Sequence, residues 1–177
     1  MITVLDKKFD LYMSAEELAH EVKRVAAEIS RDYRGKNPIL CPVLTGSFQF
    51  ASDLVKELDF DAEVSFVRYC SYQGMSSTGE VRELLGFSDS CKGRDVIIVE
   101  DIVDSGISME KMLAQVAKKE PASVAICTLF FKPESFTKHF KIDYIGKSIP
   151  NDFIVGYGLD YNGMGRTYRD VYQYVAQ

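Results

Sequence analysis

Three carboxylates stand close together in the segment DVIIVEDIVDSGISM, residues 95 to 109. Glu100, Asp101 and Asp104 follow a run of β-branched apolar residues, which indicates a buried strand. A carboxylate can accept hydrogen bonds from sugar hydroxyls, hold a hard cation through oxygen, or take a proton during a reaction. We expect the strand to end near Val99, so that all three lie just beyond its carboxyl end, where open α/β sheets bind ligands.

Small and hydroxyl-bearing residues follow these carboxylates. Ser105, Gly106 and Ser108 lie immediately before or within the first turn of a helix that we expect to begin around residues 107 to 109. Backbone N–H groups at a helix start, beside a glycine that permits close approach, form a cradle for phosphate. A phosphorylated sugar would use the cradle and the carboxylates together. The weaker alternative is that Asp104 only caps the helix while the other two carboxylates are solvated loop charges.

Strands and helices alternate along the chain and could position these residues. Ser14 and Glu17 have the S-x-x-E form of a capping box, before an amphipathic helix that we expect to stop at Gly35. Hydrophobic runs predict strands at 38–44, 64–67, 95–99 and 124–131, and helices at 48–58 and from about 107 to near 121. This alternation predicts an α/β fold with a mostly parallel central sheet flanked by helices.

The segment CSYQGMSSTGEVRELLG, residues 70 to 86, is rich in Ser, Gly and Thr. It predicts a long mobile loop or a loose hairpin. Long excursions from a compact α/β domain are often lids or binding loops, and the alternative is an exposed loop without a role.

Composition limits the classes of function. We expect one domain over residues 1–177, and a net charge of -5 offers no basic surface for nucleic acid or an anionic membrane. No segment approaches the roughly 20 apolar residues of a membrane span, and the N-terminus lacks a secretory pattern, so we expect a cytoplasmic location. Four widely spaced cysteines without a C-x-x-C pair favour neither a zinc site nor a disulfide framework.

Four segments resemble, in the same order, the motifs of one enzyme family. VIIVEDIVDSG, residues 96 to 106, is similar to the signature of type I phosphoribosyltransferases, which bind 5-phosphoribosyl 1-diphosphate. Three others resemble the hypoxanthine (hypoxanthine-guanine) branch: its diphosphate-binding turn in LTGSFQF (44–50), its mobile catalytic loop in SYQGMSSTGEV (71–81), and its purine-binding strand in FIVGYGLDY (153–161). The resemblance implies the type I phosphoribosyltransferase fold, with a small hood formed by terminal segments and a mobile catalytic loop.

The resemblance also implies a reaction of purine salvage. A purine nitrogen displaces diphosphate from the ribose, with Mg²⁺ as cofactor, giving a nucleoside monophosphate. By motif, Glu100 and Asp101 contact the ribose hydroxyls, and together with Asp160 they are the metal-linked carboxylates. The 5′-phosphate is surrounded by Asp104, Ser105, Gly106, Ile107 and Ser108. The diphosphate is bound by Thr45, Gly46 and Arg166.

Some of these assignments stay open on sequence alone. Arg169 lies close enough to Arg166 to be the family's diphosphate arginine instead. Thr45 stands where the family often has a lysine, which removes one positive charge, and the family often has a cis peptide at this turn. Ile107 stands where some relatives have a lysine in the phosphate cradle.

The base-binding residues follow from the same resemblance. Asp104 matches the general base or hydrogen-bond partner at purine N7, and Ser71 and Tyr72 match the catalytic loop's Ser-Tyr pair, which favours a lid. The purine-binding positions are Lys132, Phe153, Ile154 and Asp160. An ammonium only donates hydrogen bonds, so a lysine suits the 6-oxo group of hypoxanthine, guanine or xanthine and disfavours adenine. The alternatives are an ordinary exposed lysine and an ordinary core phenylalanine.

Two other classes of protein remain in view. A regulatory protein could keep this fold and bind phosphoribosyl diphosphate without turnover, although the acidic chain shows no attached DNA-binding module. A flavodoxin-like or receiver-like protein would also place carboxylates beyond strand ends, but it would leave the loop motif and FIVGYGLDY unexplained. Family members are commonly homodimers or homotetramers, which is the assembly that the resemblance implies.

Overall fold

The computed structural model describes the backbone of residues 1–71 and 81–176, and the side chains of those residues except at positions 70, 71, 81 and 82. Its elements along the chain are β1 (Ile2–Val4), β2 (Lys7–Met13), α1 (Ala15–Tyr33), β3 (Ile39–Leu44), α2 (Phe48–Glu57), β4 (Glu63–Val64), β5 (Val67–Ser71), β6 (Val81–Leu85), the 3-10 helix η1 (Asp89–Cys91), β7 (Asp95–Val103), α3 (Ile107–Ala117), β8 (Ser123–Phe131), β9 (Tyr144–Ser148), β10 (Ile154–Val155) and β11 (Val171–Tyr174).

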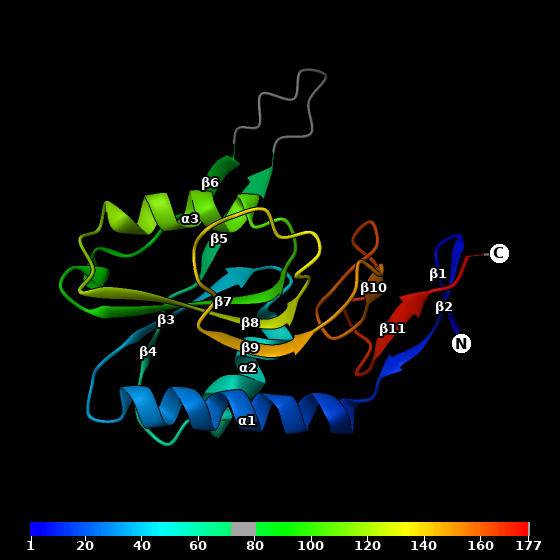
Figure 1. Cartoon of the computed structure of the whole chain (residues 1–177), viewed down its shortest axis with the longest axis horizontal. Helices are drawn as coiled ribbons and strands as arrows, with labels where there is room; N and C mark the ends of the chain where they lie inside the picture. The colour runs from blue at the N-terminus through cyan, green and yellow to red at the C-terminus, as the bar shows by residue number, and fades with distance from the viewer. Residues whose placement is uncertain (72–80, 177) are drawn as a thin grey trace.

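A mostly parallel sheet forms the centre of the molecule, as the sequence predicts. Its strand order is β6-β5-β3-β7-β8-β9, with β4 also paired to β3. The neighbours from β5 to β9 run parallel, and only β6 runs antiparallel to its partner β5. Helices α1 and α2 cover one face and α3 covers the other (Figure 1). Among the described residues, no helix is long and apolar enough to cross a membrane.

Alternate residues of β7 face the two layers of helices. Ile97 and Val99 pack into the cluster that contains α1 and α2, whereas Val96 and Ile98 pack into the cluster of α3. All four are fully buried. Burial on both faces explains why this strand reads as a continuous apolar run rather than an alternating one.

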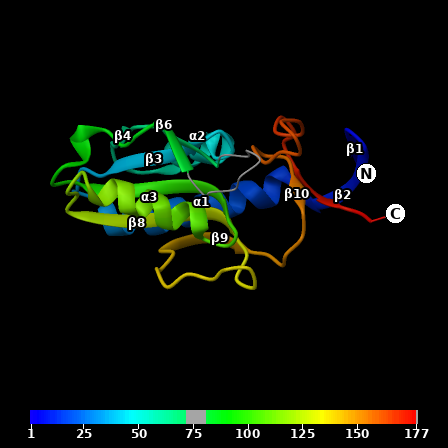
Figure 2. The same ribbon diagram turned by 90° about the horizontal axis from the view of Figure 1, so that it is seen from above.

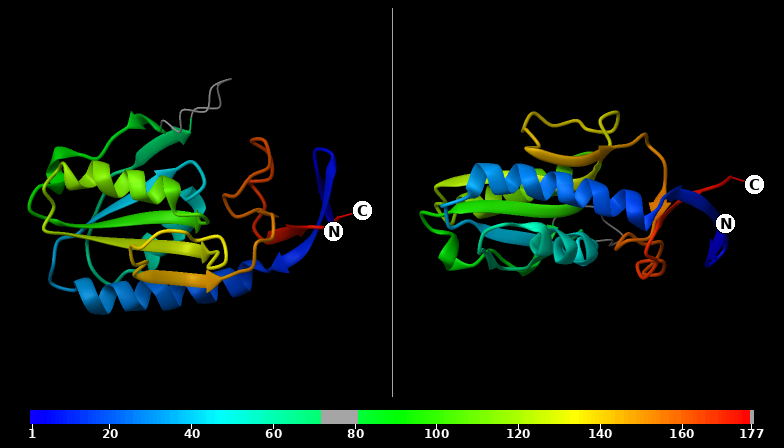
Figure 3. Two further views of the ribbon diagram at one scale, coloured as in Figure 1. Left: turned by 45° about the horizontal axis from the view of Figure 1, so that its top comes forward. Right: turned by 90° about the horizontal axis from the view of Figure 1, so that it is seen from below.

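A second, antiparallel sheet forms the hood, in the order β1-β2-β11-β10. Both chain termini lie at this end of the molecule (Figures 2 and 3). The hood is therefore built from terminal segments, as the family resemblance implies. Its strands β1, β2 and β11 were absent from the elements that hydrophobic runs predicted. The turn between β1 and β2 has Leu5 at a positive φ of 53° in place of the Asn-Gly or Asp-Gly that signals a hairpin.

Two of the predicted strands need correction. Strand β7 continues to Val103, so Glu100 and Asp101 lie within it and not beyond its end. It continues because β8 pairs with it as far as Val103, while its pairing with β3 stops at Val99. The predicted strand at 64–67 is two short strands, β4 and β5, and 43%-exposed Phe66 lies between them.

The segment at residues 70–86 contains a hairpin. Strands β5 and β6 pair antiparallel, which confirms the hairpin alternative for the part that is described. Residues 72–80 lie outside the described residues.

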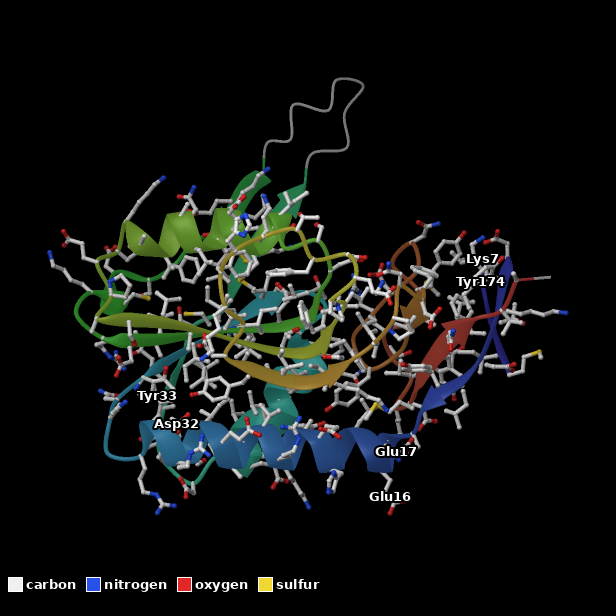
Figure 4. All side chains as sticks on the ribbon, in the orientation of Figure 1. Lys7, Glu16, Glu17, Asp32, Tyr33 and Tyr174 are labelled. Carbon is white, nitrogen blue, oxygen red and sulfur yellow. The ribbon has the colours of Figure 1, made fainter. Side chains whose placement is uncertain are left out.

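Helix α1 begins with the predicted capping box. The Glu17 N–H donates to Ser14 Oγ at 3.3 Å, and the Ser14 N–H donates to the Glu17 carboxylate at 2.8 Å. Figure 4 shows Glu17 at this end of the helix. The box fixes the point where the chain leaves hood strand β2 and enters the helix layer.

Replacing Ser14 with Ala should lower the free energy of unfolding by about 1 kcal/mol, because the cap satisfies N–H groups that have no partner within the helix. Urea denaturation measures the change. His20→Ala is the control, since His20 is exposed on the same helix and its loss should cost less than about 0.5 kcal/mol. Equal stability of the two variants would contradict the capping role.

Candidate functional site

Two adjacent carboxyls lie where β7 extends past its neighbour β3. The Ile102 N–H donates to Asp101 Oδ1 at 2.9 Å, and the Asp101 residue is only 9% exposed. Burial raises the pKa of Asp101 and raises the pKa of Glu100 well above its usual range, where the neighbouring Asp101 charge adds to the effect. These carboxyls are therefore poised to share a proton or to bind a group that compensates their charge.

The turn after β3 packs directly against the Asp101 carboxyl. Its peptide bond between Leu44 and Thr45 is cis, as is often seen at this turn in the resembling family. A Cβ atom on Gly46 would overlap the Asp101 carboxylate, and a Cβ atom on Gly158 would overlap the Gly46 carbonyl oxygen. Glycine is therefore required at position 158, where the clash is with backbone, whereas a side chain at position 46 would displace the Asp101 carboxylate. The contact of Gly158 with the turn was not predicted, although the G-Y-G sequence at 156–158 marks an unusual backbone.

The two candidate arginines occupy different places. The Arg166 guanidinium contacts Asp160 Oδ1 at 2.7 Å and donates to the Gly158 carbonyl at 2.6 Å. Its positive charge also counteracts the rise in the pKa of Asp101. Arg166 thus contacts Asp160 and Gly158 directly, and its charge also acts on Asp101 of β7. Arg169 instead lines a cavity of about 370 Å³ together with residues of α1 and α2.

The start of α3 borders a small cavity of about 120 Å³. Gly106 precedes the helix with φ at 81°, and a Cβ atom there would overlap the Phe136 ring. The Ile107 side chain is 48% exposed, and its N–H lies 3.4 Å from Ser105 Oγ. The cavity brings four of the five predicted cradle residues together with strand β7; it is lined by Glu100, Ile102, Val103, Asp104, Ser105, Gly106, Ser108 and Met109.

A buried lysine lies beside this cavity. The Lys132 residue is 8% exposed, so it is not an ordinary surface lysine. Its ammonium lies 3.3 Å from Asp104 Oδ2, and the backbone N–H of Lys132 donates to the Val103 carbonyl at 3.0 Å. The ion pair joins the residue after β8 to the residue after β7, and its acid, Asp104, lines the cavity.

An exposed aromatic ring stands at the start of β10. Phe153 is 42% exposed, so it is not a core phenylalanine. The Ile154 side chain is buried, and its residue pairs with Gln173 of β11. The segment before Phe153 is tied to the loop after Lys132 by a hydrogen bond from the Ser135 hydroxyl to Asn151. The segments that carry Lys132 and Phe153 are therefore connected to each other through neighbouring loops.

Two predictions are not tested by this geometry. Tyr72 and the side chain of Ser71 lie outside the described residues, so the lid stays a prediction. Within residues 1–71 and 81–176, no cluster of three or more His, Cys, Asp or Glu side chains is arranged to hold a metal ion. Any metal here would take further ligands from water or from substrate.

The site offers three complementary chemical elements. The N–H groups at the start of α3 suit an anion and border the same cavity as Glu100, the neighbouring Asp101 carboxyl packs against the turn after β3, and an ammonium stands beside the Asp104 carboxylate, which can take a proton. An anionic sugar and a polar ring could be held together by such an arrangement.

Comparisons with known proteins agree with this arrangement. The sequence profile of the phosphoribosyl transferase domain family matches residues 12–162. The hypoxanthine-guanine phosphoribosyltransferase of Lactococcus lactis is 40% identical over 89% of this chain and 86% of that protein, and that of Streptococcus agalactiae is 41% identical over 88% and 87%.

Solved structures are similar as well. A crystal structure of a hypoxanthine phosphoribosyltransferase from Staphylococcus aureus aligns with a TM-score of 0.88 and 33% identity, covering 99% of this chain and 96% of that one. A hypoxanthine-guanine phosphoribosyltransferase from Bacillus anthracis aligns with a TM-score of 0.86 and 34% identity, covering 96% and 99%. The chain, with its hood, glycine turn and carboxylate strand, belongs to the phosphoribosyl transferase domain family.

Proposed function

We propose that the protein transfers the 5-phosphoribosyl group of phosphoribosyl diphosphate to hypoxanthine, and also to guanine, in purine salvage. The products are inosine or guanosine monophosphate and diphosphate. The observation that carries this proposal is the ion pair of buried Lys132 with Asp104, which lines the helix-start cavity. The names of relatives at about 40% identity support the same substrates.

The sugar phosphate has a place along β7 and α3. The 5′-phosphate binds in the cavity of about 120 Å³, where N–H groups at the start of α3 and the Ser105 and Ser108 hydroxyls donate to it. Glu100 and Asp101 accept hydrogen bonds from the ribose hydroxyls. This arrangement fixes the anomeric carbon beside the turn after β3. That turn binds the diphosphate through Thr45 and Gly46, with Arg166 nearby.

The base has a place between the ion pair and the exposed ring. Phe153 stacks on the purine, and the backbone of Ile154 meets the edge of the base. Lys132 donates to the 6-oxo oxygen, while the freed Asp104 carboxylate accepts the proton of N7. When the base binds, Lys132 and Asp104 therefore each exchange their ion-pair partner for an atom of the purine.

The donor set fits a magnesium ion. Glu100 and Asp101 are adjacent carboxyls whose pKa values are raised by burial, so a hard cation would compensate their charge, and Asp160 lies within reach of the same region through Arg166. Mg²⁺ bound there would neutralise the leaving diphosphate. The transition state resembles an oxocarbenium ion, so the protein's own contribution is to position the reactants and exclude water.

Asp104→Asn should lower kcat by about a hundredfold to ten-thousandfold, because the amide keeps the shape of the carboxylate but cannot take the N7 proton. Steady-state rates with hypoxanthine measure this. Asp95→Asn is the matched control, since Asp95 begins strand β7 and Asp104 directly follows the other end of that strand. A kcat equal to that of the control would overturn the role of Asp104 as base.

Removing divalent cations with EDTA should abolish turnover, and added Mg²⁺ should restore it. The double variant Glu100→Gln, Asp101→Asn should need about tenfold more Mg²⁺ for half-maximal rate, because amides hold a hard cation less well than carboxylates. Titrating the rate with Mg²⁺ measures this, with exposed Glu16→Gln on α1 as control. Turnover in EDTA, or an unshifted Mg²⁺ titration, would contradict the metal assignment.

A further inference from the structure

The exposed ring of Phe153 is held by two aromatic residues from other segments. Phe9 of β2, which is fully buried, lies 6.0 Å from it between ring centroids at an interplanar angle of 48°. Tyr161 lies 5.7 Å from it at 84°, an edge-to-face contact. Edge-to-face pairs restrict ring orientation and stabilise it beyond simple burial. Phe153 therefore has a fixed orientation although nearly half of it faces solvent.

Tyr161 is in turn held by the N-terminal hairpin. The Lys7 ammonium lies 5.4 Å from the centroid of the Tyr161 ring and 5.1 Å from that of Tyr174. Figure 4 shows Lys7 and Tyr174 side by side in the hood. The Asp6 carboxylate interacts with the Tyr161 hydroxyl, which lowers the pKa of Asp6 and raises the pKa of Tyr161. The hairpin of β1 and β2 thus contacts Tyr161 from two positions, Asp6 in its turn and Lys7 at the start of β2.

The backbone also connects these residues. Tyr161 exchanges two hydrogen bonds with Met164, at 2.8 and 3.0 Å, and the Tyr174 N–H donates to the Phe153 carbonyl at 2.8 Å. The main chains of Tyr161 and Phe153 are therefore fixed independently of their side chains. A change confined to the Tyr161 side chain acts on the Phe153 ring and not on the path of the strand.

We propose that Tyr161 is a positioning residue, which holds the Phe153 ring in the orientation that stacks on the purine, and that Lys7 of the N-terminal hairpin holds Tyr161 in turn. The inference rests on the proposed function, in which Phe153 stacks on the base. A ring held before binding loses less conformational entropy when the base arrives. The hairpin therefore contributes to base affinity without touching the substrate.

A merely structural role for Tyr161 makes a different prediction. If Tyr161 served only the hood core, its loss would lower thermal stability and would affect both substrates alike. A positioning role changes the KM for the base while kcat and the KM for phosphoribosyl diphosphate stay the same. The KM for phosphoribosyl diphosphate also reports any disturbance of the neighbouring Asp160.

The test compares five variants of the full chain by steady-state kinetics with hypoxanthine and by thermal melting. Tyr161→Leu should raise the KM for hypoxanthine about threefold to tenfold, and Tyr161→Phe, which keeps the ring, should stay within about twofold. Lys7→Met, which removes the charge from a distant segment, should raise the KM for hypoxanthine about twofold or more. Tyr168→Leu is the matched control, because Tyr168 belongs to the same aromatic cluster and pairs with Tyr172.

Phe153→Ala tests base stacking separately from the positioning role of Tyr161. It should raise the KM for hypoxanthine about tenfold. A normal KM in Tyr161→Leu with a raised KM in Phe153→Ala would overturn the positioning role and leave stacking intact. A normal KM in both variants would overturn the stacking assignment and the positioning role together. Equal effects of Tyr161→Leu and Tyr168→Leu would assign Tyr161 to the hood core alone.

Discussion

The close approach of the Gly46 backbone to the Asp101 carboxylate is the contact on which the site depends. Strand β7 continues past the end of its pairing with β3, and the turn that follows β3 occupies the space beside the extension. Gly158 in turn packs against the Gly46 carbonyl. Three segments far apart in the sequence meet where an added side chain would collide, so the turn after β3, the carboxylate strand and the segment around Gly158 keep a fixed geometry.

The carboxyl pair at this contact is unfavourable for the free protein. Burial raises the pKa of both Glu100 and Asp101, so the folded chain holds two acids in an environment that disfavours their charged forms. Nearby Arg166 compensates part of this charge. Groups held in such an environment, beside a cavity, are typical of functional sites, and a cation with a sugar phosphate is the partner that we propose for them.

Much of the site could be predicted from local sequence, because strand, turn and helix chemistry is written in neighbouring residues. The α1 capping box, the start of α3 and the burial of β7 on both faces follow from such patterns. The end of β7 could not be predicted in this way, because it is decided by the length of the pairing between β7 and β8. Arg166 and Arg169 have the same chemistry, so only the path of the chain around Gly158 separates their surroundings.

The hood shows the same limit of local patterns. Its N-terminal turn carries Leu5 at positive φ, a conformation that leucine rarely adopts, so the residue type gives no signal of a hairpin. The exposure of Phe153 and the burial of Lys132 depend on contacts with distant segments. Sequence could identify both as candidates but could not decide between a surface role and a core role.

The most direct test of the account is the initial rate with phosphoribosyl diphosphate and Mg²⁺ against hypoxanthine, guanine, xanthine and adenine in parallel. Because Lys132 offers only donors to position 6 of the purine, we expect turnover of hypoxanthine and guanine, with a kcat/KM for adenine at least about a thousandfold lower. Adenine turnover at a comparable rate would contradict the role of Lys132. Binding of phosphoribosyl diphosphate without turnover of any base would contradict the enzyme itself.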